Sequence, residues 1–303
     1  MLRVATCQFP TCADVDDNAD HIAALMRDSA GRDAHLAHFC EGALSGYVPS
    51  DLASTDEIDW ARLQRRTQQL CALAGELGIW LVVGSTHRLT PPHRPHNSVY
   101  VVDPRGELVD RYDKRFCAGA GEGQGELASY SPGDHHVDLE VQGVRATIHV
   151  CHEYRYPELV RDAKRRGVSL ILHSFHAAGV DERLLLELQA TVAPEHRAAS
   201  RGATLPEITM PASMIAAAAS SHVWASCPNS AAPQSCFGSF FVRADGVVTG
   251  QLERHATGLL VSTVDLDEPL YDSTRAWREG AITGQRHSGS LVDDPRSRDR
   301  TSL

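Results

Sequence analysis

A short apolar strand that stops at a cysteine and gives way to a helix is the feature that most limits the fold of this chain. The run Thr147-Ile148-His149-Val150 ends at Cys151, and Pro157 with Glu158 opens a helical pattern shortly afterwards. Proline and an acidic residue are both favoured in the first turn of a helix. A cysteine on such a turn lies above the sheet edge, near backbone N–H groups that favour a thiolate. Taken alone, a single cysteine is more often a small buried hydrophobe, so the rest of the chain has to decide.

Composition excludes several classes of protein. The chain has 303 residues and a net charge of −10 without a basic run, which argues against a nucleic-acid partner. No apolar run approaches the roughly 20 residues that span a bilayer, so no membrane partner is predicted. Residues 2–9 read as a strand and not as a signal peptide, which predicts a cytoplasmic protein. The eight cysteines show no C-x-x-C spacing, which is typical of reduced core thiols.

Strand and helix patterns alternate through one continuous unit, which predicts helices that cover sheets in an α/β layered sandwich. Gly78 closes one of these helices as a C-cap would. The segment Pro194 to Pro211 has no clear periodicity. We expect one domain over residues 1–266 and a C-terminal extension over 267–303 that is loosely ordered or contributes to oligomer contacts. The predicted strands are 2–9, 35–40, 79–83, 98–102, 108–112, a pair around Gly143 that leads to 147–150, and 169–173, with others near 223, 240, 247 and 259. A first helix is predicted from the apolar face of Ile22, Leu25 and Met26, and the other predicted helices are 60–77, 157–166, 183–192 and 213–220.

Chemically active residues stand where several buried strands run out. Glu41 follows the predicted strand 35–40, Lys114 follows the predicted strand 108–112, and Cys151 ends its own strand. A fourth residue, Glu126, lies in the loop between Lys114 and Cys151. Charged residues are poorly placed in a core and well placed at one edge of a sheet, where a site forms. Each charge on its own also fits a solvated surface group or a single ion pair.

This ordered set resembles the nitrilase superfamily of carbon–nitrogen hydrolases, in which Glu, Lys and Cys occur in that order at strand ends. The resemblance extends from the first strand to about Asp265. It is supported by Asn97-Ser98, Arg155-x-Pro157-Glu158-Leu159, Asn229-Ser230, and Ser239 with Asp245-Gly246. It implies a four-layer α-β-β-α sandwich, no cofactor and no metal. By the same resemblance we expect a homodimer or a larger homo-oligomer.

Two glutamates compete for the position between Lys114 and Cys151. Members of the family commonly place this residue seven positions before the glycine of a Pro-Gly turn, here Gly133, which selects Glu126. Glu122 lies between glycines and reads more easily as a solvated charge.

These residue types suit the cleavage of an amide, which needs a nucleophile, a proton carrier and positive charge at the oxyanion. The resemblance implies that Cys151 attacks the carbonyl carbon and that Glu41 moves the protons. Lys114 and the backbone N–H of His152 face the oxyanion, and Glu126 positions Lys114 or the substrate.

Other residues are candidate substrate contacts or depart from the family pattern. His152-Glu153 follow the cysteine where many members carry Tyr-Asp, which indicates an altered pocket shape. Ser213-Met214-Ile215-Ala216 replaces a more usual Arg-Ala and acid, which puts a helix contact near the site in doubt. The residues after strand 169–173 face the same edge, although core packing explains them equally well. The candidate contacts are Tyr47, Glu153, Tyr154, Ser174, Phe175 and His176.

Histidine is frequent enough to raise the question of a metal. The loop histidines His87, His93 and His96 and the adjacent pair His135-His136 show no H-x-x-x-H helical spacing. We therefore predict no metal site.

The sequence is thus interpreted as a thiol-dependent hydrolase that releases ammonia or an amine from a small linear amide or N-carbamoyl compound. A nitrilase acting on a small nitrile is the nearest alternative, because a thioimidate forms at the same residues. An acyltransferase and a catalytically silent binding protein with the same fold also remain open.

Overall fold

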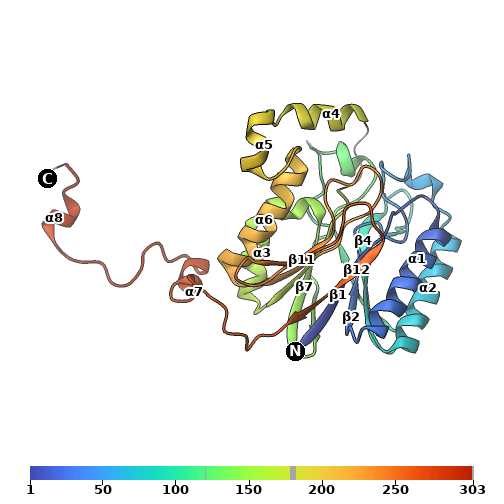
Figure 1. Cartoon of the computed structure of the whole chain (residues 1–303), viewed down its shortest axis with the longest axis horizontal. Helices are drawn as coiled ribbons and strands as arrows, with labels where there is room; N and C mark the ends of the chain where they lie inside the picture. The colour runs from blue at the N-terminus through green and yellow to red at the C-terminus, as the bar shows by residue number, and fades with distance from the viewer. Residues whose placement is uncertain (120, 178–181, 302–303) are drawn as a thin grey trace.

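The computed structural model describes residues 1–119, 121–177 and 182–301. Two six-stranded sheets pack face to face, and helices cover the outer face of each (Figure 1). This four-layer α-β-β-α sandwich confirms the predicted fold class. Residue 120, in the loop between Lys114 and Glu126, and the last two residues of the predicted extension lie outside the described residues.

Each sheet has three parallel strands at its centre and antiparallel strands at its margins. The first sheet has the order β12 (Gly258–Val264), β1 (Leu2–Gln8), β2 (Leu36–His38), β3 (Trp80–His87), β4 (His96–Val102) and β5 (Leu108–Asp113). The second has the order β11 (Val248–Gln251), β10 (Phe240–Val242), β9 (Trp224–Cys227), β8 (Leu170–Ser174), β7 (Val144–Val150) and β6 (Asp138–Val141). Because the central strands are parallel, their carboxyl ends gather at one edge, where ligand sites form in sheets of this kind.

Two helices lie on the first sheet and two on the second (Figure 1). The first pair is α1 (Val15–Gly31) and α2 (Trp60–Leu77), and the second is α3 (Pro157–Arg165) and α6 (Leu205–Ser221). The shorter helices are α4 (Glu182–Ala190), α5 (Pro194–Ser200), α7 (Arg278–Ile282) and α8 (Pro295–Arg298), with 3₁₀ turns η1 (Thr55–Glu57), η2 (Gly125–Ala128) and η3 (Cys151–Arg155). Pro157 is at the start of α3 as expected, and Gly78, at φ 66°, ends α2 in the left-handed conformation that favours glycine.

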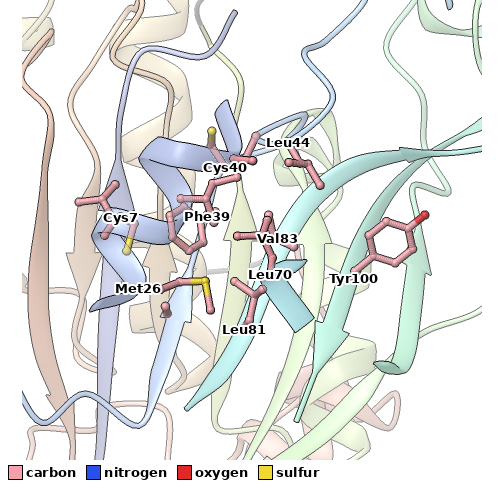
Figure 2. Packing of buried hydrophobic residues seen from close by; sticks show 14 of the residues in the cluster. Cys7, Met26, Phe39, Cys40, Leu44, Leu70, Leu81, Val83 and Tyr100 are labelled. Carbon is pink, nitrogen blue, oxygen red and sulfur yellow. The ribbon is translucent and has the colours of Figure 1, made fainter. Parts of the chain in front are cut away.

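Apolar side chains fill all three spaces between the layers. Figure 2 shows the space between the first sheet and its helices, where Met26 of α1 and Leu70 of α2 lie among residues of β1 and β3 and Phe39, which follows β2. Valine and leucine dominate the space between the two sheets. The sandwich is therefore held by burial on both faces of each sheet, which suits near-continuous apolar strands.

The region from Pro194 to Pro211, which showed no clear periodicity in the sequence, is mostly helical, and the predicted helix 213–220 begins too late. It contains α5 and the first turns of α6, which begins at Leu205 and not near Ser213. Thr204 caps α6 by accepting a hydrogen bond from the backbone N–H of Glu207, and Pro206 occupies the first turn. Pro211 inside α6 looks like a helix breaker in the sequence, and the burial of Met214 and Ala218 against the second sheet outweighs its local cost.

A chain of polar side chains joins the two sheets inside the sandwich. His38 of β2 is fully buried and lies 2.9 Å from the Ser226 hydroxyl of β9 and 3.0 Å from the Ser174 hydroxyl of β8. Burial lowers the pKa of His38 well below its usual value, so the ring is neutral and offers one donor and one acceptor. These paired polar groups fix how the two sheets face each other, because any other register leaves them unsatisfied.

The C-terminal part leaves the sandwich as an extended segment that carries α7 and α8 (Figure 1). Arg165 of α3 donates to the carbonyl oxygen of Ile282 at 2.8 Å, which ties α7 to the body. The described residues after 283 are exposed. A separate extension over residues 267–303 stays a prediction. In the part of the chain that the structure describes, no helix combines the length and apolar character needed to cross a bilayer.

Gly84 of β3 lies directly beneath the turn that follows β2. A Cβ atom added there would meet the carbonyl oxygen of Cys40, and would come within 2.7 Å of the Gly42 nitrogen and 2.8 Å of the Glu41 Cα. The Gly84 carbonyl also accepts a hydrogen bond from Leu44 N–H at 2.9 Å. Only glycine therefore lets the turn at Glu41 rest on β3.

Gly84→Ala should lower the free energy of unfolding by about 1–3 kcal/mol, because the added methyl group overpacks the turn. Chemical denaturation measures this change. Gly31→Ala is the matched control: nothing lies within 4 Å of its added Cβ, so its stability should stay within about 0.5 kcal/mol of the original. Equal stability of the two variants would contradict this account of the turn.

Candidate active site

Cys151 occupies the turn between β7 and η3 with a strained backbone. Its φ of 40° lies in the left-handed region that residues other than glycine adopt uncommonly. Such strain persists only where neighbouring structure imposes it, and it concentrates at functional sites. The helix that the sequence predicted after the cysteine is present as α3, which follows the 3₁₀ turn η3.

Glu153 holds this turn in place from inside the protein. One carboxylate oxygen accepts hydrogen bonds from the Tyr112 hydroxyl at 2.6 Å and from the backbone N–H groups of Arg115 and Phe116 at 3.0 and 3.2 Å. The other accepts from Val150 N–H at 2.8 Å. With its oxygens used in this way, Glu153 connects the Cys151 turn to the residues after Lys114.

A buried lysine joins two buried carboxylates at the strand ends. Lys114 follows β5, Glu41 follows β2, and Glu126 lies in η2. The Lys114 Nζ is 2.7 Å from Oε1 of Glu41 and 2.7 Å from Oε1 of Glu126, and all three side chains are at most 3% exposed. The structure thus brings together three of the four residues that the sequence singled out, and it leaves Glu122 exposed on the surface.

The two carboxylates have different surroundings. Both oxygens of Glu126 are occupied: Lys114, the Tyr47 hydroxyl at 2.8 Å and Asn97 Nδ2 at 3.1 Å donate to Oε1, and Ala118 N–H donates to Oε2. Glu41 accepts hydrogen bonds from Lys114 and Asn97 on Oε1 alone, and its buried Oε2 has no hydrogen-bond partner among the described residues.

This difference separates the pKa values of the two carboxyl groups. Burial raises the pKa of Glu41, and the charge of Glu126 adds to that rise against the opposing charge of Lys114. Burial also disfavours ionisation of Glu126, but Lys114 and the other donors lower its pKa below the usual value. Burial opposes the charge of Lys114, and the two glutamates together raise its pKa well above the usual value. Glu126 therefore stays ionised, whereas Glu41 is the carboxyl group suited to exchanging a proton.

The surroundings of Cys151 oppose the thiolate that the turn was expected to favour. Burial and the nearby charge of Glu41 raise the pKa of Cys151 well above its usual value, against the opposing effects of Lys114 and the backbone N–H of His176. The backbone donor comes from the residues after β8, and burial together with the charge of Glu41 outweighs it. A proton acceptor is thus required before the sulfur can act as a nucleophile.

A cavity of about 240 Å³ opens onto Cys151 and Lys114. It is smaller than the roughly 300–1,000 Å³ typical of sites for drug-sized ligands, which limits it to a small molecule. A hollow of about 500 Å³ beside Trp60 is lined by none of these residues. The wall of the Cys151 cavity also includes Tyr47, Pro49, Ser50, Ala118, His152, Arg155, His176, Ala177, Pro206, Met210 and Cys236.

The six candidate substrate contacts divide into three pairs. Tyr47 and His176 line the cavity. Glu153 and Tyr154 border a separate hollow of about 200 Å³ against α6. Ser174 donates to the Phe39 carbonyl, and Phe175 packs on Phe237 and Phe240, so both are fully occupied by the protein. The structure therefore places only the first pair where a bound molecule would touch them.

Several residues of the site were missed from the sequence. Asn97 bridges Glu41 and Glu126, although the sequence flagged it only as a family mark. Its position could have indicated this role, because Asn97 is a polar residue directly before the predicted strand that pairs with the strand before Lys114. Asp51, which accepts a hydrogen bond from His176, and Arg155, which lines the cavity, gave no such signal because loop geometry determines their positions.

Three of the histidines considered as metal ligands have partners within the protein, and two of them, His87 and His96, lie at the ends of β3 and β4 and not in a loop. His87 Nδ1 lies 2.8 Å from the Tyr100 hydroxyl, His96 Nδ1 lies 2.8 Å from the Ser131 carbonyl, and His135 Nε2 lies 2.7 Å from the Arg111 carbonyl. Within residues 1–119, 121–177 and 182–301, His, Cys, Asp and Glu form no group of three that could hold a metal ion.

The family model for carbon–nitrogen hydrolases matches residues 3–276, so the chain belongs to the carbon–nitrogen hydrolase family. It is an enzyme of the nitrilase superfamily, as the sequence predicted.

Its relatives and structural neighbours include several amidases. It is 25% identical to human deaminated glutathione amidase over 179 residues, which cover 56% of this chain and 54% of that protein. A glutamine-dependent NAD(+) synthetase of Acinetobacter baylyi is 24% identical over 171 residues, 56% of this chain and 30% of that protein. The match thus spans about half of the first relative and less of the second.

Among solved structures, a cysteine variant of a Nesterenkonia amidase of the nitrilase superfamily superposes with a TM-score of 0.66 at 25% identity, covering 88% of this chain and 91% of that one. Another variant of that amidase carries acrylamide added at its active-site cysteine, with a TM-score of 0.68 at 24% identity and coverage of 88% and 94%.

Glu126→Gln should reduce the hydrolytic rate strongly, because the amide cannot accept hydrogen bonds on both of its terminal atoms and leaves Lys114 with one fewer ionised partner. We expect a loss of at least about 100-fold in kcat, comparable to removal of one preorganised electrostatic group. Glu122→Gln is the matched control, since its exposed side chain should give unchanged rates. Steady-state kinetics on both variants checks the ranking, and the reverse order would assign the role to Glu122.

Proposed function

We propose that this enzyme hydrolyses the carbon–nitrogen bond of a small linear amide or N-carbamoyl compound through a thioester on Cys151. One observation carries the proposal: a cavity of small-molecule size ends at Cys151 and Lys114, beside a buried glutamate whose free oxygen has no partner. The amidases among its relatives and structural neighbours support the same reaction class.

In the first half of the reaction, the Cys151 sulfur attacks the carbonyl carbon and its proton passes to Oε2 of Glu41. Lys114 has three N–H donors and uses two on the glutamates, so the third faces the developing oxyanion together with the backbone N–H of His152. Glu41 then gives its proton to the departing nitrogen, the C–N bond breaks, and a thioester remains.

In the second half, water attacks the thioester and gives a proton to Glu41. The C–S bond breaks, the sulfur recovers the proton, and the acid leaves the cavity. Glu126 remains ionised throughout and holds Lys114 in position with Tyr47 and Asn97. Each proton accepted by Glu41 is returned within the same half-reaction, which suits a carboxyl group of raised pKa.

Cys151→Ala should abolish turnover and leave the fold intact, because the side chain supplies the covalent bond and little packing. Cys151→Ser should also be inactive, since a hydroxyl is much harder to ionise beside the same base. Ammonia release from a panel of amides, carbamoyl amines and nitriles measures the loss, with Cys71→Ala on α2 as the active control. Turnover retained in Cys151→Ala would remove the nucleophile from the proposal, and ammonia from nitriles alone would make the enzyme a nitrilase.

Glu41 must be ionised to accept the thiol proton, so kcat/KM should fall with decreasing pH. Since burial raises the pKa of Glu41, the midpoint of this fall in kcat/KM should lie above 4.5, the usual pKa of an exposed glutamate. Glu41→Gln should form little acyl adduct on Cys151 when mixed with a good amide, whereas the unaltered enzyme should form one that mass spectrometry detects. An abundant adduct in Glu41→Gln would confine Glu41 to thioester breakdown.

A further inference from the structure

His173 of β8 contacts the Cys151 turn through its side chain, and the proposed reaction does not use it. It pairs in register with His149 of β7 and is 1% exposed. Its Nε2 lies 3.0 Å from the carbonyl oxygen of Cys151. The second sheet thus contacts the strained turn at the peptide group that follows the proposed nucleophile.

The surroundings of His173 decide which of its nitrogens carries a hydrogen. Burial lowers the pKa of the ring to about 3, against the opposing effect of the Cys151 carbonyl and together with the charge of Lys114. The imidazole is therefore neutral near pH 7 and has one N–H. A carbonyl oxygen can only accept a hydrogen bond, so this N–H is on Nε2 and donates to Cys151.

Aromatic rings hold the imidazole of His173 in place. Its centroid lies 4.3 Å from that of Phe175, with 35° between the ring planes, and 6.1 Å from that of His149, with 87° between them. Phe175 in turn packs on Phe237, with centroids 5.4 Å apart. A ring that is packed in this way has little freedom to turn, so the second sheet determines the direction of its N–H.

The Cys151 carbonyl and the His152 N–H belong to one peptide group. This group is planar and trans, so its oxygen and its hydrogen point in opposite directions. The oxygen points toward His173, which borders the hollow against α6 and is not among the described residues that line the Cys151 cavity. The hydrogen is directed to the opposite side, and His152 does line that cavity.

The His152 N–H is suited to meeting a ligand. His152 is in the first turn of η3, and the first N–H groups of a helix have no partner within it. A hydrogen bond on the carbonyl end of a peptide group also polarises the group, which strengthens its N–H as a donor. Relaxation of the strained Cys151 backbone, at φ 40°, would rotate this group, and the hydrogen bond from His173 opposes that rotation.

We propose that His173 is a positioning residue of the oxyanion site, which directs the His152 N–H toward the developing negative charge by holding the carbonyl end of the same peptide group. The inference rests on the proposed function, in which this N–H and Lys114 stabilise the oxyanion. His173 touches neither the substrate nor the sulfur. It acts only through the backbone.

His173→Phe tests this role, because the phenyl ring keeps the packing on Phe175 and lacks the N–H. The kcat for the best amide of the panel should fall by about 10- to 100-fold. Complete loss of an oxyanion donor costs about 100- to 1,000-fold, and here the donor remains but is less well directed. KM should change little, since the interaction stabilises the transition state.

His149→Phe is the matched control. His149 occupies the paired position on β7 and borders the same hollow. Its Nε2 has no hydrogen-bond partner among the described residues, so the substitution removes no contact to the Cys151 turn through that atom. Its kcat should equal that of the unaltered enzyme. A fall as large as that in His173→Phe would mean that any change on this face of the sheet disturbs the site, and would overturn the role.

The reactivity of the Cys151 thiol separates this role from a structural one. Methyl methanethiosulfonate is attacked at sulfur and develops no oxyanion: an S–S bond forms, and methanesulfinate leaves as the thiol proton is lost. His173→Phe should therefore be modified at the unaltered rate, measured by mass spectrometry of Cys151, although its kcat falls. A modification rate that falls in parallel with kcat would mean that His173 only keeps the sulfur in place, which contradicts the proposal.

A second pair of variants decides the question if His173→Phe does not fold. His173→Gln carries an N–H donor at a similar reach, and His173→Met has a similar length without a donor. The kcat of His173→Gln should exceed that of His173→Met by about 10-fold, and equal values would refute the role of the N–H.

Failure of the inference differs from failure of the proposed function. An unaltered enzyme that hydrolyses no member of the panel would remove the proposed function, and the oxyanion role with it. An unaltered enzyme that hydrolyses amides, with kcat retained in His173→Phe, would overturn only the role of His173.

Discussion

The site depends on one buried cation. Lys114 carries its charge into a region where it has almost no contact with water, and only the two glutamates make that placement stable. Two carboxylates around one ammonium leave a net negative charge when both are ionised. Glu126 accepts more hydrogen bonds than Glu41, so the negative charge is better stabilised on Glu126. The same arrangement therefore holds a charge in the interior and differentiates two chemically identical side chains.

Glu41 lies 73 residues from Lys114 in the sequence, so the charged cluster forms only when the first sheet and its connecting loops are complete. The Cys151 turn belongs to the second sheet, and Glu153 connects it to the residues after Lys114. The inter-sheet contacts of His38 add a second polar connection at the level of the strands. Assembly of the site thus requires correct packing of one sheet on the other, and not merely the folding of either.

The layered fold and the strand-end positions were predictable because they follow from periodicity and from residues that are costly to bury. The choice of Glu126 depended on its distance from Gly133, and the structure gives that spacing a physical basis. Gly133 N–H donates to the Lys114 carbonyl at 2.9 Å, and a Cβ at Gly133 would collide with Asp113, so the loop between them is closed at a fixed length. The raised pKa of Cys151 was not predictable, because it depends on burial and on the nearby charge of Glu41, which only the tertiary fold produces. The start of α6 was missed because Pro211 gives the same local signal whether a helix ends there or continues through it.

The raised pKa of Cys151, the proposed nucleophile, has consequences for the lifetime of the enzyme. Peroxides and adventitious electrophiles react with thiolates, and susceptibility to irreversible oxidation follows thiolate character. In the proposed reaction, Glu41, whose charge adds to the effect of burial on the pKa of Cys151, also removes the thiol proton once a substrate occupies the cavity. A raised thiol pKa therefore lowers the reactivity of the sulfur toward such reagents while the cavity is empty.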